Sequence, residues 1–166
     1  KLLSEQILSL SEHCQLKKIS FQMEADLVPE TVLLNCTIFE KLLQRLIDHA
    51  LEVSNEGVIR LQIKSMWQED KYFLELALSD TGPKMTQADQ DLLFFSSDAS
   101  IPLEKIEYSA NLLSLALSRF QAHFLGGELL YAYSDKNVFT LRLPSLSYSG
   151  KKVELKPLPV PENETI

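Results

Sequence analysis

The sequence Ser79-Asp80-Thr81-Gly82 ends a stretch of alternating apolar residues and contains the clearest candidate for chemistry. From Tyr72 to Leu78 the apolar side chains share one face of a predicted strand, and the period of two places the Asp80 carboxylate on that face too. A carboxylate directed at a core needs a partner, because burying it unpaired is costly. Asp80 is therefore either an acceptor for a ligand or, as we expect, an aspartate that hydrogen-bonds its own turn through Thr81 and Gly82.

A second group of candidates lies on a predicted amphipathic helix over about residues 37 to 53. Its first residues, Thr37-Ile-Phe-Glu40, have the spacing of a capping box. Arg45, His49 and Glu52 follow i, i+4, i+7 spacing, so they line one edge of the helix at the border of its apolar face. This spacing predicts that the three side chains face the same pocket.

The other histidines and the cysteines give no catalytic signature. His13 is expected at the surface near a helix end, and His123 is expected to be packed or to cap a helix end. No Ser-His-Asp order, His-x-x-x-His sequence or paired carboxylates indicate hydrolysis, so we predict no catalytic residue and no metal site. Cys14 and Cys36 lack CxxC spacing and lie in apolar surroundings, which predicts buried thiols in a reducing compartment.

Length and charge limit the class of protein. The 166 residues, 45% of them hydrophobic, are enough for about one domain with one core. A net charge of −7 and a pI near 5.0 argue against nucleic acid as a partner, because that binding needs a basic surface. No apolar run approaches the roughly 18 residues of a membrane-spanning helix, and we expect no charged-then-apolar leader before Lys1. We expect a cytoplasmic domain without direct membrane contact, which includes the cytosolic part of a membrane-anchored sensor.

The two ends of the chain suggest a piece of a longer protein. The chain begins without Met, and prolines alternate with other residues from Pro157 to Pro161. Such spacing is typical of a stiff, extended connector. We expect residues 1–146 to form the domain and residues 147–166 to form a Pro-rich linker toward a following module.

Hydrophobic periodicity predicts the order of helices and strands. The pattern indicates a helix over 4–14, a strand over 19–25, a short apolar piece over 32–34, the helix over 37–53, a hairpin of strands 59–63 and 72–80, a short helix starting at the Thr86-to-Asp89 capping box, a helix over 112–124, and a hairpin of strands 129–133 and 139–143. Gly126-Gly127 is expected to end the last helix in left-handed backbone conformations. This order predicts an α/β fold in which helices cover one face of a mixed sheet.

Three features in this order resemble the ATP-binding domain of histidine kinases, which belongs to a wider family that includes gyrase and MutL. Arg45 to Ser54 lies where that family has an Asn-rich helix, Ser79 to Gly82 matches the first glycine box, and Leu115 to Arg119 with Gly126-Gly127 matches the sequence after the second. The resemblance covers about residues 4–144 and implies a two-layer α/β sandwich of the Bergerat type with a mostly antiparallel sheet. It also implies that the ligand partner of Asp80 would be the adenine amino group.

Several positions that hold Mg·ATP in that family are replaced. His49 stands where the family has an Asn whose oxygen binds Mg²⁺, and an imidazole nitrogen suits zinc, copper or nickel better than magnesium. Arg45 stands where an Asn or His orients the attack, and Glu52 stands where a Lys commonly lies near the phosphates. Exchanging Lys for Glu turns an attraction into a repulsion of about 4 kcal/mol at 4 Å and an effective dielectric constant of about 20.

The glycines that would contact the phosphates are missing. Pro83-Lys84-Met85 follows Gly82 in place of a second glycine, and Ala110-Asn111-Leu112-Leu113-Ser114 replaces the Gly-x-Gly-x-Gly stretch. Glycine is used there because backbone amides must approach the phosphates with no Cβ in the way. We therefore expect helix at 110–114 and count Asn111 and Ser114 among the degenerate nucleotide-site positions. Lys84 could still meet a phosphate, but we expect it to be solvated.

Our interpretation is a catalytically degenerate histidine kinase-like ATPase domain, a pseudokinase module of a two-component or phosphorelay protein. No cofactor is expected. The module would act through contacts with dimerisation or phosphotransfer domains of its own protein, with a partner histidine kinase, or with a response regulator. The alternative is a divergent but active histidine kinase domain that binds Mg·ATP. A third hypothesis is a domain that binds an adenine-like effector without magnesium.

Overall fold

The computed structural model describes residues 2–26, 28–32, 35–68, 71–94, 110–145 and 148–153. Its helices are α1 (Leu2–Leu16), α2 (Cys36–Val53), α3 (Gln87–Leu93) and α4 (Ala110–Phe124). Its strands are β1 (Ser20–Ala25), β2 (Val28–Val32), β3 (Val58–Gln68), β4 (Lys71–Asp80), β5 (Glu128–Tyr133), β6 (Asn137–Ser145) and β7 (Tyr148–Val153). The order agrees with the order predicted from the sequence, with β7 added at the end.

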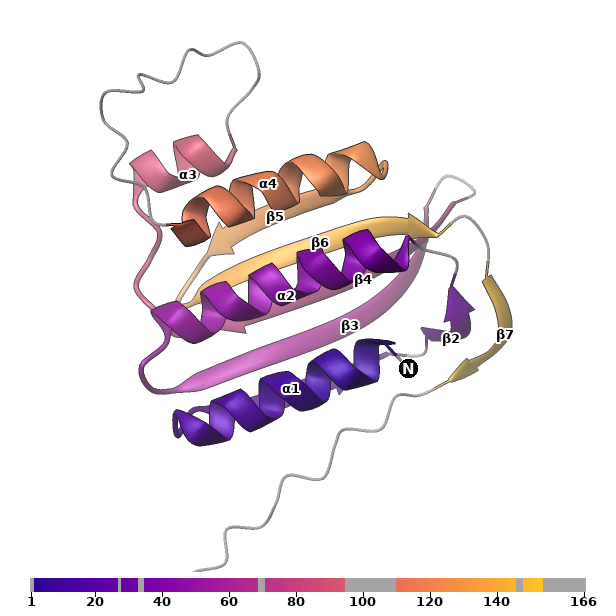
Figure 1. Cartoon of the computed structure of the whole chain (residues 1–166). Coiled ribbons are helices and arrows are strands. Elements are labelled where there is room, and N and C mark those ends of the chain that lie inside the picture. The colour runs from indigo at the N-terminus through magenta and orange to yellow at the C-terminus, as the bar shows by residue number, and fades with distance from the viewer. Residues whose placement is uncertain are drawn as a thin grey trace, which may run out of the picture.

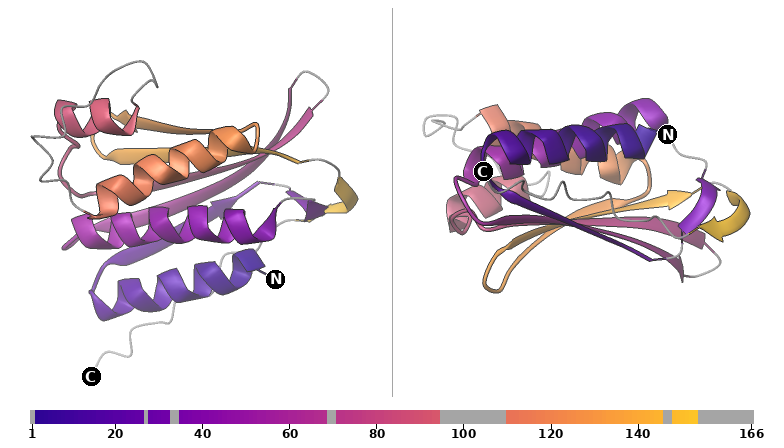
Figure 2. Two further views of the ribbon diagram at one scale, coloured as in Figure 1. Left: turned by 45° about the horizontal axis from the view of Figure 1, so that its top comes forward. Right: turned by 90° about the horizontal axis from the view of Figure 1, so that it is seen from below.

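The central sheet has five strands in the order β1-β3-β4-β6-β5. β1 pairs with β3 in parallel, and every other neighbouring pair in this sheet is antiparallel. Helices α1, α2 and α4 cover one face of the sheet, with α2 between the other two (Figure 1, Figure 2). The predicted two-layer α/β sandwich with a mixed, mostly antiparallel sheet is therefore confirmed.

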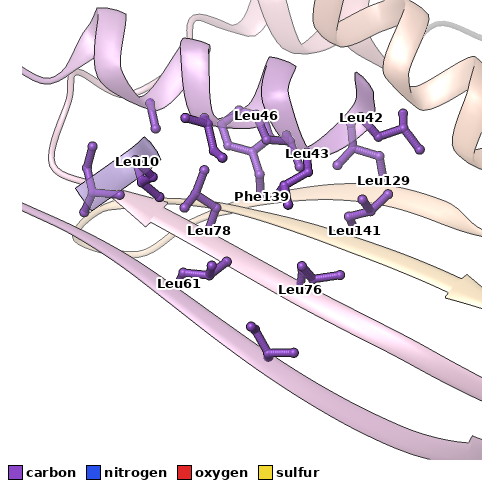
Figure 3. Packing of buried hydrophobic residues seen from close by; sticks show 14 of the residues in the cluster. Leu10, Leu42, Leu43, Leu46, Leu61, Leu76, Leu78, Leu129, Phe139 and Leu141 are labelled. Atoms are coloured by element: carbon purple, nitrogen blue, oxygen red, sulfur yellow. The ribbon is translucent and has the colours of Figure 1, made fainter. Parts of the chain in front are cut away.

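The core lies between α2 and the middle strands of the sheet (Figure 3). Leu42 and Leu46 of α2 are at most 1% exposed, as are Leu76 of β4 and Phe139 and Leu141 of β6. Fully burying a side chain of this size stabilises the fold by roughly 2 kcal/mol relative to leaving it in water. This packing fixes α2 over β4 and β6, and it therefore sets the direction in which the polar edge of α2 points.

The start of α2 differs from the sequence prediction. Asn35 is the N-cap, and its side-chain oxygen accepts a hydrogen bond from the Ile38 N–H at 3.1 Å, so the predicted capping box at Thr37-Ile-Phe-Glu40 is not the cap. The first helical residue, Cys36, is exposed, so the prediction of a buried thiol there is wrong. Cys14 is buried as predicted, and that burial raises the pKa of its thiol to about 11.

The predicted start of α3 and the predicted end of α4 are confirmed, whereas α1 extends two residues beyond its predicted range at each end. Thr86 caps α3, and its hydroxyl oxygen accepts a hydrogen bond from the Asp89 N–H at 3.1 Å. Gly126 follows the end of α4 with φ of +76°, which is the left-handed conformation expected of a glycine at that place. Gly127 does not share this conformation, but a Cβ there would lie 2.2 Å from the Arg142 carbonyl oxygen.

Strands β2 and β7 form a separate two-stranded antiparallel sheet. β2 contains Pro29, and its register shifts between Pro29 and Thr31, as is typical of an edge. The predicted short strand over 32–34 thus lies earlier, at Val28–Val32, and residues 33–34 are outside the described residues. The first part of the expected linker, residues 148–153, is strand β7. Its pairing partner lies more than a hundred residues away, so no local pattern indicates it; residues 154–166 are outside the described residues.

Candidate functional site

Asp80 lies at the end of β4 with its side chain turned into the protein. The residue is 1% exposed. Its Oδ1 accepts hydrogen bonds from the Gly82 N–H at 2.8 Å and from the Asn137 side-chain Nδ2 at 2.9 Å. The turn hydrogen bond that the sequence predicts for Asp80 is therefore present, and a second donor from β6 reinforces it.

Asn137 joins Asp80 to two neighbouring segments. Its Nδ2 also lies within hydrogen-bond distance of the carbonyl oxygens of Gly82, at 3.2 Å, and Pro83, at 3.1 Å. Its Oδ1 accepts a hydrogen bond from the Tyr131 hydroxyl at 2.8 Å, and that hydroxyl accepts one from the Met85 N–H at 3.1 Å. The network holds the loop after β4 against the β5–β6 hairpin.

Sequence reasoning did not identify Asn137 or Tyr131 as site residues. The sequence predicts a strand over 129–133, which includes Tyr131, and a strand over 139–143, which begins just after Asn137. Asn137 lies opposite Asp80 in the antiparallel pairing of β4 with β6. The pairing of β5 with β6 then brings the Tyr131 hydroxyl to Asn137. An Asn at the start of a strand is a weak signal by itself, and only the pairing register gives it this role.

Two buried polar atoms of the site have no partner among the described residues. They are Asp80 Oδ2 and His49 Nδ1. Buried polar groups are nearly always hydrogen-bonded, and an unpaired group costs about 1–3 kcal/mol. A ligand that forms a hydrogen bond with either of these two atoms would therefore remove the free-energy cost of leaving that atom unpaired.

His49 is packed as an uncharged ring. Its ring contacts Phe139 edge-on, with centroids 5.1 Å apart and planes at 80°. Burial lowers the pKa of His49, while the negative charges of Asp80 and Glu52 act in the opposite direction. Because burial is the largest cause, the ring is neutral at neutral pH and its nitrogens are hydrogen-bonding groups.

The three α2 residues predicted to face one pocket have different surroundings. Arg45 donates a hydrogen bond to the Gln121 side-chain oxygen of α4 at 2.5 Å, so it links the two helices. His49 faces Phe139 of β6. Glu52 is exposed, so any repulsion it exerts on a phosphate is screened by solvent and is worth about 1 kcal/mol or less. The large Coulomb energy expected from its sequence position does not apply to an exposed carboxylate.

In the loop after Asp80, Gly82 is tightly packed against α2, whereas Lys84 is exposed to solvent. A Cβ added to Gly82 would lie 2.7 Å from Val53 Cγ2 and 2.9 Å from the Val53 carbonyl oxygen, so only glycine fits there. Lys84 is exposed as expected, and its Nζ lies 5.3 Å from the centre of the Tyr133 ring. A cation over an aromatic face at this distance is attracted to it.

The stretch that replaces the phosphate-binding glycines is helical, as predicted. Helix α4 begins at Ala110, and Leu112 is 6% exposed. The Ser118 hydroxyl donates a hydrogen bond to the Ser114 carbonyl oxygen at 2.9 Å, which ties Ser114 into the helix. The backbone of Asn111 lies in α4, and its side chain is outside the described residues.

The hollow that the structure shows near α4 lies away from Asp80. It has a volume of about 260 Å³ and is lined by Phe73, His123, Gly126, Gly127, Glu128 and Arg142. Arg142 is near the opposite end of β6 from Asn137, and its charge is paired with Glu75 at 2.8 Å and Glu128 at 2.6 Å. His123 is exposed in the last turn of α4, and His13 is exposed in the last turn of α1, where it contacts the Ser9 carbonyl oxygen at 2.7 Å.

His49 is a poor ligand for a magnesium ion. Across the described ranges, no group of three or more His, Cys, Asp or Glu side chains is placed to hold a metal ion. His49 offers a neutral nitrogen where the resemblance requires an oxygen, and Mg²⁺ prefers oxygen ligands. Among the same residues, no helix combines the length and the apolar content needed to cross a membrane.

The fold of the chain is similar to that of histidine kinases and of their catalytic domains. The nucleotide-free catalytic domain of the histidine kinase ThkA matches with a TM-score of 0.64 and 18% identity, over 86% of this chain and 89% of that chain. The Acinetobacter baumannii histidine kinase AdeS matches with a TM-score of 0.60 and 20% identity, over 88% of this chain and 64% of that chain. Full-length ShkA in complex with AMPPNP matches with a TM-score of 0.65 and 16% identity, over 93% of this chain and 30% of that chain.

The likeness lies in the structure and not in the sequence. No protein-family model matches this chain, and no curated protein matches it. TM-scores of 0.60–0.65 establish a shared fold, and at 16–20% identity any activity must be argued from the residues of the site.

Proposed function

We propose that this chain is a catalytically degenerate histidine kinase-like ATPase domain of a two-component or phosphorelay signalling protein. It binds ATP weakly or not at all. It acts through protein contacts, with dimerisation or phosphotransfer domains, a partner histidine kinase or a response regulator. No catalytic residue, metal ion or cofactor is part of this proposal.

The observation that carries the proposal is the state of residues 110–114. They are the first residues of α4, and Leu112 packs into the protein with 6% of its surface exposed. From the fifth residue of an α-helix onward, each backbone N–H bonds to a carbonyl four residues earlier, so the Ser114 amide is not free for a phosphate; the amides of residues 110–113 form the first turn and have no such partner within the helix. Unwinding this turn into a loop that wraps a phosphate would require unpacking the buried Leu112, which costs about 2 kcal/mol or more.

The surroundings of Asp80 support the same conclusion. Its Oδ1 is already bonded to Gly82 and to Asn137. His49 supplies no oxygen for magnesium, and the exposed Glu52 supplies a negative charge where a phosphate would need a positive one. Because micromolar affinity corresponds to about 8 kcal/mol, losing the phosphate and metal contacts together removes most of the expected nucleotide affinity.

The direct test is calorimetric titration of the chain with ATP and with ADP, each with and without Mg²⁺. We expect no magnesium-dependent binding at protein concentrations near 50 µM, where a micromolar site would saturate. Asp80→Asn serves as the matched variant and should give the same trace. Magnesium-dependent binding in the micromolar range, lost in Asp80→Asn, would overturn the proposal in favour of an active kinase domain.

A second candidate function is supported by the unpaired Asp80 Oδ2. This buried acceptor has no hydrogen-bond donor among the described residues, and the Nδ1 atom of the neutral His49 ring also has no hydrogen-bond partner among them. A planar ligand with an amino group beside a ring nitrogen, such as adenine, offers a donor and an acceptor side by side. Binding of adenine that is independent of magnesium and is abolished by Asp80→Asn would establish this effector role; equal binding by both proteins would exclude it.

A further inference from the structure

Helix α4 is apolar on two opposite faces. Leu112, Leu115 and Ala122 are at most 6% exposed and pack against the rest of the protein. A different set lies on the other side of the helix: Leu113 is 49% exposed, Leu117 48%, Phe120 66% and Phe124 86%. At about 100° per residue, this second set is centred opposite the buried set and points away from the core.

An apolar face of a helix is normally covered, so a second apolar face indicates a second contact. The two phenylalanines expose about 300 Å² per copy at the area typical of an aromatic side chain, and the half-exposed leucines bring the patch to roughly 450 Å². That is within the range of the largest apolar patch on a soluble monomer, and such patches are often functional. We call the four residues Leu113, Leu117, Phe120 and Phe124 the α4 stripe.

The spacing of the α4 stripe indicates another helix as its partner. Its members are separated by four, three and four residues, which is the a/d spacing of a coiled-coil seam. The stripe lies on the exposed side of α4. Helix α4 has α2 on one side and α3 on the other (Figure 1). A second helix can therefore lie along it without displacing α2.

We propose that the partner is the α4 stripe of a second copy of this chain, with the two helices antiparallel. The stripe is symmetric about the point between residues 118 and 119. A two-fold axis at that point places Phe124 opposite Leu113 of the second copy, and Phe120 opposite its Leu117. Each large aromatic ring then meets a smaller side chain, which is the self-complementarity that a two-fold interface requires.

Charge also permits this contact in an acidic protein. Although the chain has a net charge of −7, α4 contains no Asp or Glu. Its cation Arg119 is directed inward, at the Leu93 carbonyl oxygen and the Phe94 ring, whose centre lies 5.6 Å from the guanidinium carbon. Two α4 helices therefore meet without bringing their own charges of one sign together.

The area predicts a weak dimer. Two stripes together bury about 900 Å², slightly below the roughly 1,000 Å² that a stable specific interface exceeds. We therefore expect dissociation constants of roughly tens of micromolar. The interface does not depend on whether the domain binds nucleotide, so it stands or falls separately from the proposed function.

Sedimentation of the whole chain over roughly 10 to 200 µM tests the interface. We expect a monomer–dimer equilibrium that Phe120→Gln/Phe124→Gln weakens at least tenfold. The matched control is Leu8→Gln/Leu16→Gln on α1, where the two leucines are 51% and 83% exposed; it should dimerise like the unaltered chain. Unchanged thermal unfolding midpoints verify that both variants are folded. A monomer at every concentration, or equal weakening by both variants, would refute the proposal.

Disulfide crosslinking tests the antiparallel register. In a Cys36→Ser background, which removes the exposed native thiol, a mixture of Leu117→Cys and Phe120→Cys chains should give a covalent heterodimer under mild oxidation. Each variant alone should crosslink much less, because the two-fold axis places residue 117 opposite 120 and not opposite itself. Equal crosslinking by either variant alone would show that the register is wrong.

Discussion

Replacing Asn137 with Ala tests whether the Asp80 network holds the loop after β4. The change removes the donor to Asp80 Oδ1 and the acceptor of the Tyr131 hydroxyl. A hydrogen bond to a charged group is worth about 1.5–3 kcal/mol, and the stranded hydroxyl adds about 1 kcal/mol, so we expect a loss of about 3 kcal/mol in the free energy of unfolding. Against a typical total of roughly 5–15 kcal/mol, that is a large loss.

Urea denaturation at neutral pH measures this loss. With a slope of about 2 kcal/mol per molar urea, the midpoint should fall by roughly 1.5 M. Ser134→Ala in the exposed turn before β6 is the control, and it should change the free energy of unfolding by no more than about 0.5 kcal/mol.

A double-mutant cycle with Asp80→Asn separates the network from simple packing. Because a neutral amide is cheaper to leave unpaired than a buried carboxylate, Asn137→Ala should cost about 1–2 kcal/mol less in the Asp80→Asn background. A loss below about 1 kcal/mol for Asn137→Ala alone, or the same loss in both backgrounds, would show that the Asn137 amide does not stabilise the Asp80 carboxylate.

Three further predictions concern individual side chains. Burial lowers the folded-state pKa of His49 below the unfolded value of about 6.5, so the unfolded chain binds more protons and the free energy of unfolding should fall as pH drops below 6.5. His49→Gln should therefore lose less stability than the unaltered chain between pH 7 and pH 5. An equal or greater loss would show that His49 is not the buried group that titrates in this range. With the Cys14 pKa raised to about 11 by burial, a thiol reagent at pH 8 should modify Cys36 alone in the native chain and both cysteines in denaturant. The double variant His49→Asn/Glu52→Lys should show no ATP hydrolysis in a coupled assay, because the glycines at 110–114 remain absent. Hydrolysis by that double variant would show that the helical start of α4 is compatible with phosphate binding.

Much of the fold follows from local patterns in the sequence. The alternation in β3, β4 and β6 and the amphipathic pattern of α2 predict both the elements and the side of each that is buried, because one face must pack in a two-layer domain. The Thr86 cap and the stop at Gly126 were predicted for the same reason, since each depends on a few adjacent residues.

What local patterns missed depends on long-range pairing. Strand β7 pairs with β2, which lies more than a hundred residues away in the sequence, so no local pattern indicates it. The cap of α2 is different, because it is a local hydrogen bond between Asn35 and the Ile38 N–H, and the sequence prediction chose the nearby Thr37 instead. In the site, the sequence predicted the turn at Asp80 but not Asn137 as its second donor, because the register between β4 and β6 is a property of the folded sheet. Likewise, i, i+4, i+7 spacing placed Arg45, His49 and Glu52 on one edge but did not reveal their separate surroundings.

The pairing of β2 with β7 sets a practical limit on where this chain can be shortened. A protein cut after residue 146 would keep β2 and lose the strand that satisfies its outer backbone groups. An open strand edge of this kind readily recruits a strand from another molecule. A truncated version would therefore be prone to aggregation for reasons unrelated to nucleotide or partner binding, and studies of solution assembly require a chain that extends through Val153.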